Sequence, residues 1–237
     1  MNVTSFGAGL DAVRYHDRLA SDWDERYQQV SFRARLVALA ECLDGEDLGG
    51  TEWLDAGCGT GTLSRWLAEH GCAVLGVDAA PKMINSAAML ANSEYSSRLL
   101  RFQHVETIAQ LPLDSHSANG ILCSSVLEYV PDPEACLAEF ARVLRPGGIL
   151  VVSVPSSHSV IRRAQIACNR VGQLLGKDWV AYLSYSKNQY SHLEFESMLA
   201  RHRFCLDRAL SFGGPLPRWM QRTRTGGPLL MFSARKL

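Results

Sequence analysis

The sequence contains no long apolar run and no excess of charge of either sign. No stretch approaches the roughly 18 apolar residues that a membrane-spanning helix requires. Lysine plus arginine number 24, as do aspartate plus glutamate, so the formal net charge is zero. This balance gives no electrostatic reason to expect a polyanionic partner such as DNA or tRNA. We therefore expect a soluble protein whose partner is a small molecule and not a nucleic acid.

The sequence also lacks the cysteine pairs of a disulfide framework or a zinc site. Its seven cysteines are scattered, with no C-x-x-C pair and no histidine at ligand spacing. Their number is odd, and the N-terminus carries no signal-like apolar segment. This pattern predicts reduced, buried cysteines in a cytoplasmic protein.

One glycine-rich segment carries most of the information. Trp53 and Leu54 close a short apolar strand, the pattern D-x-G-x-G-x-G follows from Asp55 to Gly61, and residues 63–70 have the pattern of a helix. Because glycine tolerates positive φ and has no Cβ, the main chain there can approach a ligand closely. A second strand, 73–77, leads to Asp78, whose carboxylate can accept both hydroxyls of a ribose. These features predict a nucleotide-type cofactor site.

The spacing of the glycines separates two kinds of cofactor. A dinucleotide fingerprint, G-x-G-x-x-G, needs glycine at position 62, where this chain has Thr62. Asp55 also places a carboxylate beside the loop, where it would repel a pyrophosphate and attract an ammonium group. Both observations favour S-adenosylmethionine over NAD or FAD.

With these motifs the chain resembles the class I S-adenosylmethionine-dependent methyltransferases, in particular the small-molecule branch similar to the ubiquinone and menaquinone biosynthesis enzymes. The resemblance covers residues 50–155 and rests on four ordered segments, 53–71, 74–84, 100–112 and 121–155. It implies an α/β fold with a Rossmann-like, seven-stranded, mostly parallel sheet between helices and an antiparallel last strand.

The length of 237 residues and the 47% apolar content suit one such domain. We expect a single methyltransferase domain over residues 1–237. Its parts would be a helical lid (1–50), a cofactor-binding core (51–155), an acceptor-pocket insertion after the fifth strand (156–203) and C-terminal strands (204–237).

The resemblance assigns the cofactor to residues of the matching motifs. Asp55 would hold the loop amides and contact the methionine end, Asp78 would bind the ribose, and Arg35, with Arg33 as the alternative, would bind the carboxylate. Relatives place an adenine-binding aspartate after the third strand, where this chain has Thr107, or Glu106 if the alignment slips by one residue. The remaining cofactor residues expected are Gly57, Cys58, Gly59, Gly61, Ala79, Met83, Ile108 and Ser124.

The segment after the fourth strand departs from the ubiquinone enzymes. Those enzymes carry E-x-x-E-H there, a set associated with a divalent metal, whereas this chain has Ser125, Glu128 and Tyr129. The loss of one carboxylate and of the imidazole leaves too few protein ligands for a defined site. We therefore expect that no metal is required.

The acceptor would lie among aromatic side chains of the lid and the insertion. For a general base, His158 is the first candidate, because it follows the fifth strand at the carboxyl end of the sheet, where such sheets bind ligands. His16 and His192 are its rivals, and a structural or solvent-exposed role is the alternative for each. The acceptor-binding residues expected are Tyr15, Trp23, Tyr129, Tyr185 and Tyr190.

Residues 160–175 have the pattern of an amphipathic basic helix. One interpretation is a helix packed on the sheet or the lid with solvated arginines, which base rates favour. The other is a peripheral contact with a membrane surface or a lipid acceptor. The apolar face would carry Val160, Ala164, Ala167, Val171, Leu174 and Leu175, with Arg162, Arg163 and Arg170 flanking or opposing it.

The function expected is S-adenosylmethionine-dependent methyl transfer to a small organic acceptor, at oxygen, in quinone or secondary metabolism. Transfer to nitrogen or carbon is one alternative. Another is a cofactor-binding or regulatory module without turnover, since a shared fold does not fix the chemistry. The identity of the acceptor and the oligomeric state stay open.

Overall fold

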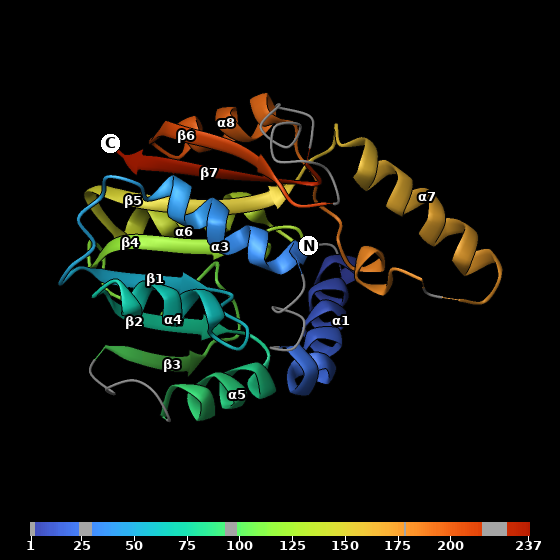
Figure 1. Cartoon of the computed structure of the whole chain (residues 1–237), viewed down its shortest axis with the longest axis horizontal. Helices are drawn as coiled ribbons and strands as arrows, with labels where there is room; N and C mark the ends of the chain where they lie inside the picture. Colours follow the sequence, from blue (N-terminus) through green and yellow to red (C-terminus); the bar gives the residue numbers. More distant parts are fainter. Residues whose placement is uncertain (1–2, 24–29, 93–98, 178, 215–226) are drawn as a thin grey trace.

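Seven strands form one sheet in the computed structural model, which describes residues 3–23, 30–92, 99–177, 179–214 and 227–237. Their order is β3-β2-β1-β4-β5-β7-β6; β1 to β5 run parallel, and β7 is antiparallel to both β5 and β6 (Figure 1). The predicted fold class, with its antiparallel last strand, is confirmed. The strands are β1 (Glu52–Ala56), β2 (Ala73–Asp78), β3 (Leu100–His104), β4 (Ala118–Ser124), β5 (Leu144–Pro155), β6 (Phe204–Phe212) and β7 (Leu229–Lys236).

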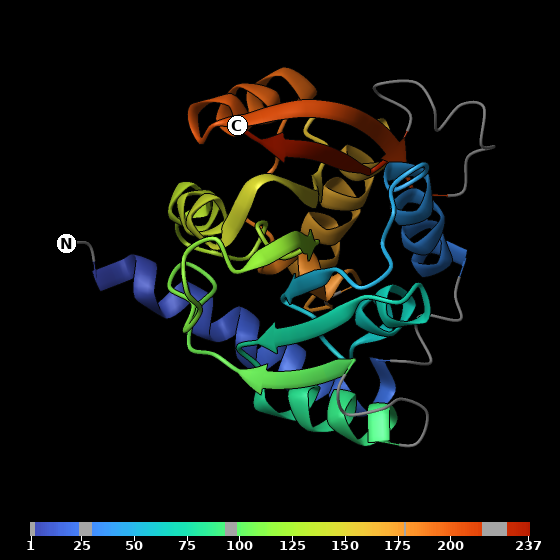
Figure 2. The same cartoon turned by 90° about the vertical axis from the view of Figure 1, so that its left-hand side faces the viewer.

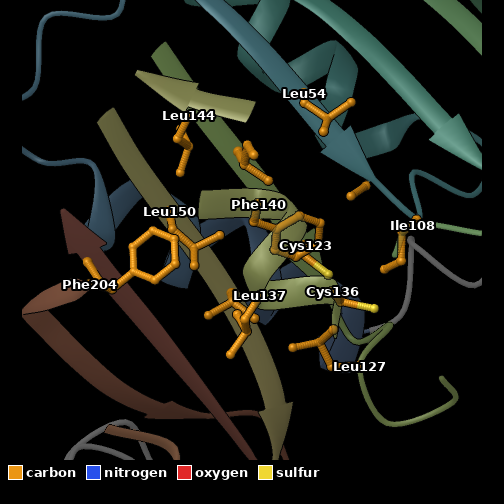
Figure 3. Packing of buried hydrophobic residues seen from close by; sticks show 14 of the residues in the cluster. Leu54, Ile108, Cys123, Leu127, Cys136, Leu137, Phe140, Leu144, Leu150 and Phe204 are labelled. Carbon is orange, nitrogen blue, oxygen red and sulfur yellow. The ribbon is translucent and has the colours of Figure 1, made fainter. Parts of the chain in front are cut away.

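Both faces of the sheet are buried, because side chains alternate along each strand. Trp53 and Val151 belong to one apolar cluster, whereas Leu54 and Leu150, their neighbours in sequence, belong to the other. Figure 3 shows the second cluster, with Phe140 among Leu150, Leu137 and Cys123. The first cluster includes side chains of α3 (Val30–Cys42), α4 (Thr62–Glu69) and α5 (Pro81–Asn92), and the second those of α6 (Pro133–Val143) and α8 (His192–Arg201).

Two helices begin at residues that cap them. Pro133 stands at the first turn of α6, and the Asp132 side chain accepts a hydrogen bond from the amide of Ala135 at 2.9 Å. Ser191 and Glu194 form a reciprocal capping box at the start of α8. These caps satisfy amides that the helices themselves leave without partners.

The fifth strand contains an irregular segment near its start. β5 begins at Leu144, which pairs with Ala118, and the ladder resumes where Ile149 pairs with Gly120. The residues between them belong to β5 as an irregularity within it. Gly147 accommodates this irregularity with φ of 76°.

The parallel strands point toward the side of the molecule where α1 (Val3–Leu19) and α7 (Val160–Leu174) lie, as Figure 1 shows. Figure 2 views the sheet from the other end of the strands and shows both helices beyond it. This is the carboxyl end of the parallel strands, where open α/β sheets bind their ligands. Each of these helices is followed by a short 3₁₀ helix. η1 (Ala20–Asp22) follows α1, and η2 (Ala181–Ser184) follows α7.

The insertion after β5 is closed at its base. Ser156 and Tyr190 form a bridge, Ser157 donates to the Tyr190 carbonyl at 2.9 Å, and Tyr190 donates to the Pro155 carbonyl at 3.0 Å. Helix α8 follows and packs Phe195 into the sheet core. Within the predicted insertion, 156–203, Tyr190 and α8 therefore pack against the core.

Helix α7 faces the opposite way from the favoured interpretation. Arg162 and Asn169 are buried, and the residues of the predicted apolar face are exposed, with 87% exposure at Leu174 and 76% at Val160. The prediction of a packed apolar face with solvated arginines is wrong for Arg162, because that side chain finds a buried carboxylate partner. No helix among the described residues is long and apolar enough to cross a membrane.

The cysteines differ from expectation at two positions. All seven are free, and five are buried, but Cys168 and Cys205 are exposed. Cys168 lies on the exposed side of α7, and Cys205 lies on the edge strand β6. Burial raises the pKa of Cys42 and of Cys136 to about 12, so both are held as thiols.

Candidate functional site

The glycine loop between β1 and α4 takes a conformation that only glycine adopts without strain. Gly57 and Gly61 both have φ of 80°, and Gly59 has φ of 55°. A Cβ on Gly57 would overlap Val126, and one on Gly61 would lie 2.5 Å from the Phe102 ring. Two of the three glycines are thus required by packing within the protein, in addition to any approach of a ligand.

The amides of this loop donate hydrogen bonds to β2. The expectation that Asp55 would hold them is wrong. Gly57 and Cys58 donate to the Val77 carbonyl at 2.7 and 3.0 Å, and Gly59 donates to Asp78 Oδ2 at 2.9 Å. Asp55 is buried within β1, and Ser64 of α4 donates to its Oδ2 at 2.6 Å. Burial raises the pKa of Asp55 from 3.8 to about 7, against the opposing effect of the Ser64 hydrogen bond.

Asp78 ends β2 at the mouth of the loop. Its Oδ1 accepts from the amide of Ala80 at 2.8 Å while its Oδ2 accepts from Gly59. Burial raises its pKa, and the two amides and the His16 ring act in the opposite direction. Each carboxylate oxygen can accept a second hydrogen bond, so the group can still receive two hydroxyls.

Aromatic side chains from distant parts of the chain meet above this loop. Tyr15 stacks on Tyr185 with ring centroids 4.8 Å apart, and His16 packs edge-on against Tyr129 at 4.8 Å and against Trp23 at 5.4 Å. Trp23 Nε1 lies 3.4 Å from where a Cβ on Gly59 would be. We call these five residues the lid cluster. Four of the five predicted acceptor residues and one of the three candidate bases are in it.

The other predicted acceptor residue and bases lie elsewhere. Tyr190 packs against Phe195 in the sheet core, and His192 packs beside Phe232 and lies 3.5 Å from Glu196. His158 is exposed, and its charge acts on Glu194 at the start of α8. The chain turns after β5 into the bridged base of the insertion, which takes His158 and His192 away from the lid cluster.

Arginine 35 joins α3 to the segment after β4. Its Nη2 donates to Ser125 Oγ at 3.3 Å, and its charge acts on both Glu128 and Tyr129. Ser125 has φ of 58°, in the left-handed region, and its amide donates to Ser153 Oγ at 2.9 Å. Ser124 Oγ lies 3.1 Å from the same Ser153 hydroxyl. A strained non-glycine residue at the end of a central strand is typical of a functional segment.

The remaining predicted cofactor residues divide between core and surface. Met83 is buried with Ala80 and Ala20 beneath the lid, and Cys58 is buried in the loop. Ile108 is buried in the sheet core, whereas Thr107 is exposed and its Oγ1 accepts from the amide of Ala109 at 3.1 Å. Ala79 is half-buried, and Arg33, the alternative to Arg35, is exposed.

A buried ion pair escaped the sequence analysis. Arg162 Nη2 of α7 lies 3.1 Å from Glu128 Oε2, and both side chains are only 3% exposed. Ser186 Oγ bonds to both partners, and Arg162 Nη1 donates to Tyr182 at 3.4 Å. The one sequence signal was a glutamate in an otherwise apolar segment, and its partner lies 34 positions away.

This pair bears on the metal question. The Glu128 carboxylate, which the resemblance associated with a divalent metal, is neutralised here by a guanidinium of the same chain. Burial raises its pKa and the Arg162 charge lowers it. Among the described residues, no group of three or more histidine, cysteine, aspartate or glutamate side chains is placed to hold a metal ion. The segment therefore does not fit a metal.

Comparison with known proteins identifies the domain that the central part of the chain forms. The model of the methyltransferase domain family matches residues 54–152. Residues 54–152 form a class I methyltransferase domain. Domains of this class take their methyl group from S-adenosylmethionine, and the glycine loop beside Asp78 fits that cofactor.

Curated relatives of this chain are ubiquinone biosynthesis O-methyltransferases. The chain is 34% identical over 143 residues to a ubiquinone biosynthesis O-methyltransferase of Xanthomonas oryzae. The aligned residues make up 60% of this chain and 59% of that relative. The chain thus spans about three fifths of that relative's length.

Solved structures show the same fold over most of the chain. A methyltransferase from Thermotoga maritima matches with a TM-score of 0.70 at 19% identity, over 93% of this chain and 98% of that chain. A [4+2]-cyclase, SpnF, matches with a TM-score of 0.63 at 18% identity, over 85% of this chain and 80% of that chain. Since a protein named as a cyclase shares the fold, the fold alone does not fix the reaction.

Proposed function

We propose that the protein transfers the methyl group of S-adenosylmethionine to an oxygen atom of a small organic acceptor, in quinone or secondary metabolism. One observation supports this most: the glycine loop with Asp78 and the lid cluster meet at the carboxyl end of the sheet. A cofactor bound along the loop would therefore present its methyl group toward aromatic side chains. The name of the Xanthomonas relative supports oxygen as the accepting atom.

The cofactor would be held mainly by β1, β2 and the loop between them. Asp78 would accept the ribose hydroxyls, and Gly57, Gly59 and Gly61 would let the methionine end lie against the main chain. Asp55 would add negative charge near the sulfonium and the ammonium group. Arg35 would bind the carboxylate. The remaining contacts would come from Cys58, Ala79, Met83, Thr107, Ile108 and Ser124.

Alignment can supply most of the rate, because the methyl group of a sulfonium is already activated. Holding the acceptor oxygen and the methyl carbon in near-attack geometry is worth about 7–11 kcal/mol. The lid cluster would suit an aromatic acceptor, because an aromatic ring can pack against its side chains. Tyr15 stacks on Tyr185 there, and the rings of Tyr129 and Trp23 lie beside them. The lid would also exclude water from the sulfonium.

Among the candidate bases, we favour His16 as the group that would accept a proton from the acceptor. Its ring lies within the lid cluster, and its Nδ1 lies 2.8 Å from the Ala12 carbonyl. A general base contributes about 10²–10⁴-fold. We expect His16→Gln to lower kcat by roughly that factor with little change in cofactor affinity. The matched control is His158→Gln, which should keep wild-type kcat; equal rates for the two variants would contradict this role.

Two alternatives concern the reaction itself. Methyl transfer to nitrogen or carbon would use the same alignment and is separated by mass spectrometry of the labelled product. A cofactor-binding module without turnover is favoured by the exposed Thr107 in the adenine region, where relatives carry an aspartate. Transfer of labelled methyl into cell extract separates this alternative, since an inert module gives no labelled product.

The binding part of the proposal has a cheap test. S-adenosylhomocysteine should raise the unfolding temperature, whereas NAD and ATP should not, because only a ligand of the folded state stabilises it. Stabilisation by NAD alone would overturn the proposal. A cytoplasmic location, an undivided domain over the whole chain and the absence of a metal requirement stay predictions beside it.

We further propose that α7 makes a peripheral contact with an anionic membrane surface. Its exposed apolar face is flanked by exposed basic residues, and this combination binds the boundary between headgroups and acyl chains. Trp179, 53% exposed, extends the same region. The apolar side chains are Val160, Ala164, Ala167, Val171, Leu174 and Leu175, and the basic ones Arg163, Arg170 and Lys177.

Sedimentation with vesicles tests this contact. The protein should pellet with vesicles rich in phosphatidylglycerol and less with phosphatidylcholine alone, and Leu174→Glu should abolish pelleting. Leu193→Glu is the matched control, because Leu193 is 67% exposed but lies on α8. Equal loss in both variants, or no pelleting of the wild type, would contradict the proposal.

A further inference from the structure

The buried ion pair between Glu128 and Arg162 joins three separate parts of the chain. Glu128 follows β4, Arg162 lies on α7, and Ser186, which bonds to both, follows η2. The main chain adds further bonds at the same junction. The Glu128 carbonyl accepts from the amides of Lys187 and Asn188 at 2.8 and 3.2 Å. The segment after β4 and the far end of the insertion are thus fixed to each other.

Stabilisation of the fold is a weak explanation for this buried ion pair. Transfer of two charges out of water has a penalty that their attraction often fails to recover, so a buried pair is weak support for a stabilising role. Arg162 Nε is also buried and has no hydrogen-bond partner among the described residues. An unsatisfied buried donor calls for an explanation beyond packing.

The position of the pair beside two lid rings indicates a role for it. Tyr129 is the next residue after Glu128, and Tyr185 immediately precedes Ser186. These two rings receive the two neighbouring lid residues of α1, since His16 packs on Tyr129 and Tyr15 stacks on Tyr185. The bonds among Glu128, Arg162 and Ser186 therefore fix the spacing of the two rings on which α1 docks.

We propose that Arg162 is a positioning residue that holds the docking surface of the lid. Its guanidinium clamps Glu128 to Ser186, and so sets Tyr129 and Tyr185 at the separation that Tyr15 and His16 require. The clamp acts on the lid, and through Trp23 over Gly59 on the cover of the loop, without touching the cofactor. The use of a docked lid in catalysis rests on the proposed function. The docking itself does not, because it can be measured without methyl transfer.

Hydrogen exchange followed by mass spectrometry on the full chain, without added ligand, tests this role. Arg162→Met should raise exchange in α1 by about tenfold, equivalent to about 1.4 kcal/mol of opening free energy, and leave α4 and α8 unchanged. Arg163→Met, the same change at the next, exposed position of α7, is the matched control and should leave all three helices as in the wild type.

A milder variant protects the test against misfolding. Ser186→Ala removes one hydroxyl from the clamp and should raise α1 exchange by a smaller factor, and Arg162→Lys should restore part of the protection. Exchange that rises equally in α1, α4 and α8 would show a general structural role and overturn the proposal. No rise in α1 above the Arg163→Met control would overturn it as well. Neither result would bear on binding of S-adenosylhomocysteine by the wild type, which tests the proposed function separately.

Discussion

The two halves of the candidate site are built from different kinds of contact. In the cofactor half, main-chain amides of the glycine loop bond to the Val77 carbonyl and the Asp78 carboxylate, all within 22 consecutive positions, 57–78. In the acceptor half, side chains from α1, α3, the segment after β4 and the insertion meet over long sequence separations. Local main-chain geometry makes the first half recognisable from sequence, whereas the second half exists only in the folded chain.

The largest effect should come from adding one methyl group to the loop. Gly57→Ala would combine strain at φ of 80° with overlap of Val126, which together cost roughly 2–5 kcal/mol in the free energy of unfolding. Urea denaturation measures this cost. Gly45→Ala is the matched control, because Gly45 has φ of 88° but no atom within 4 Å of the added Cβ.

The control separates strain from overlap. Gly45→Ala should cost only the strain, about 1 kcal/mol or somewhat more. Combining Gly57→Ala with Val126→Ala should recover much of the difference between the two glycine variants. If Gly57→Ala costs no more than Gly45→Ala, packing against Val126 does not explain this glycine.

Sequence reasoning predicted the glycine loop itself but not the partners of its amides. The glycine pattern and Asp78 predicted the loop, because positive φ and a strand-end carboxylate leave a local signature. The predicted partner of the loop amides was wrong. Asp55 accepts a hydrogen bond from Ser64 instead, because α4 packs on β1. The number of strands and the antiparallel last strand followed from the family resemblance, whereas the strand order came from the structure.

The acceptor half could be predicted only as a list of aromatic residues. Tyr15, Trp23, Tyr129 and Tyr185 do meet, but Tyr190 was drawn into the core by Phe195. Arg162 was assigned to solvent because helical periodicity opposes it to an apolar face. A periodicity argument cannot tell which face of a protruding helix finds a buried partner, and here that partner was Glu128.

The next effect in size concerns the ribose. Asp78→Ala should weaken binding of S-adenosylhomocysteine about 100-fold, because hydrogen bonds to a charged group are worth about 1.5–3 kcal/mol each. Isothermal calorimetry measures the affinity. Asp114→Ala, at an exposed aspartate away from the loop, should bind as the wild type does. Unchanged affinity in Asp78→Ala would remove the ribose from this position.

A smaller effect should appear in the dependence of stability on pH. The pKa of Asp55 is raised from 3.8 to about 7 by burial, so the folded state binds its proton more tightly than the unfolded state. Stability from this group is present below pH 3.8 and is lost as pH rises through about 7. Asp55→Asn should therefore flatten the fall in unfolding free energy across this range.

The same variant should change binding in the opposite direction. At pH 8 Asp55→Asn should be more stable than the wild type but bind S-adenosylmethionine less tightly, because the buried charge that destabilises the empty loop attracts the sulfonium. Denaturation curves at several pH values and calorimetry at pH 8 check the two effects. A variant that loses stability at pH 8 would contradict the assignment of Asp55 as a destabilising charge.

The central claim is that the glycine loop and Asp78 hold the adenosine and methionine parts of S-adenosylmethionine beneath the lid cluster. A crystal structure of the full chain with S-adenosylhomocysteine tests it most directly. The account predicts both ribose hydroxyls on the Asp78 carboxylate and the homocysteine main chain along Gly57 to Gly61. Adenosine bound away from Asp78, or a loop that stays free of ligand at saturating concentration, would contradict it.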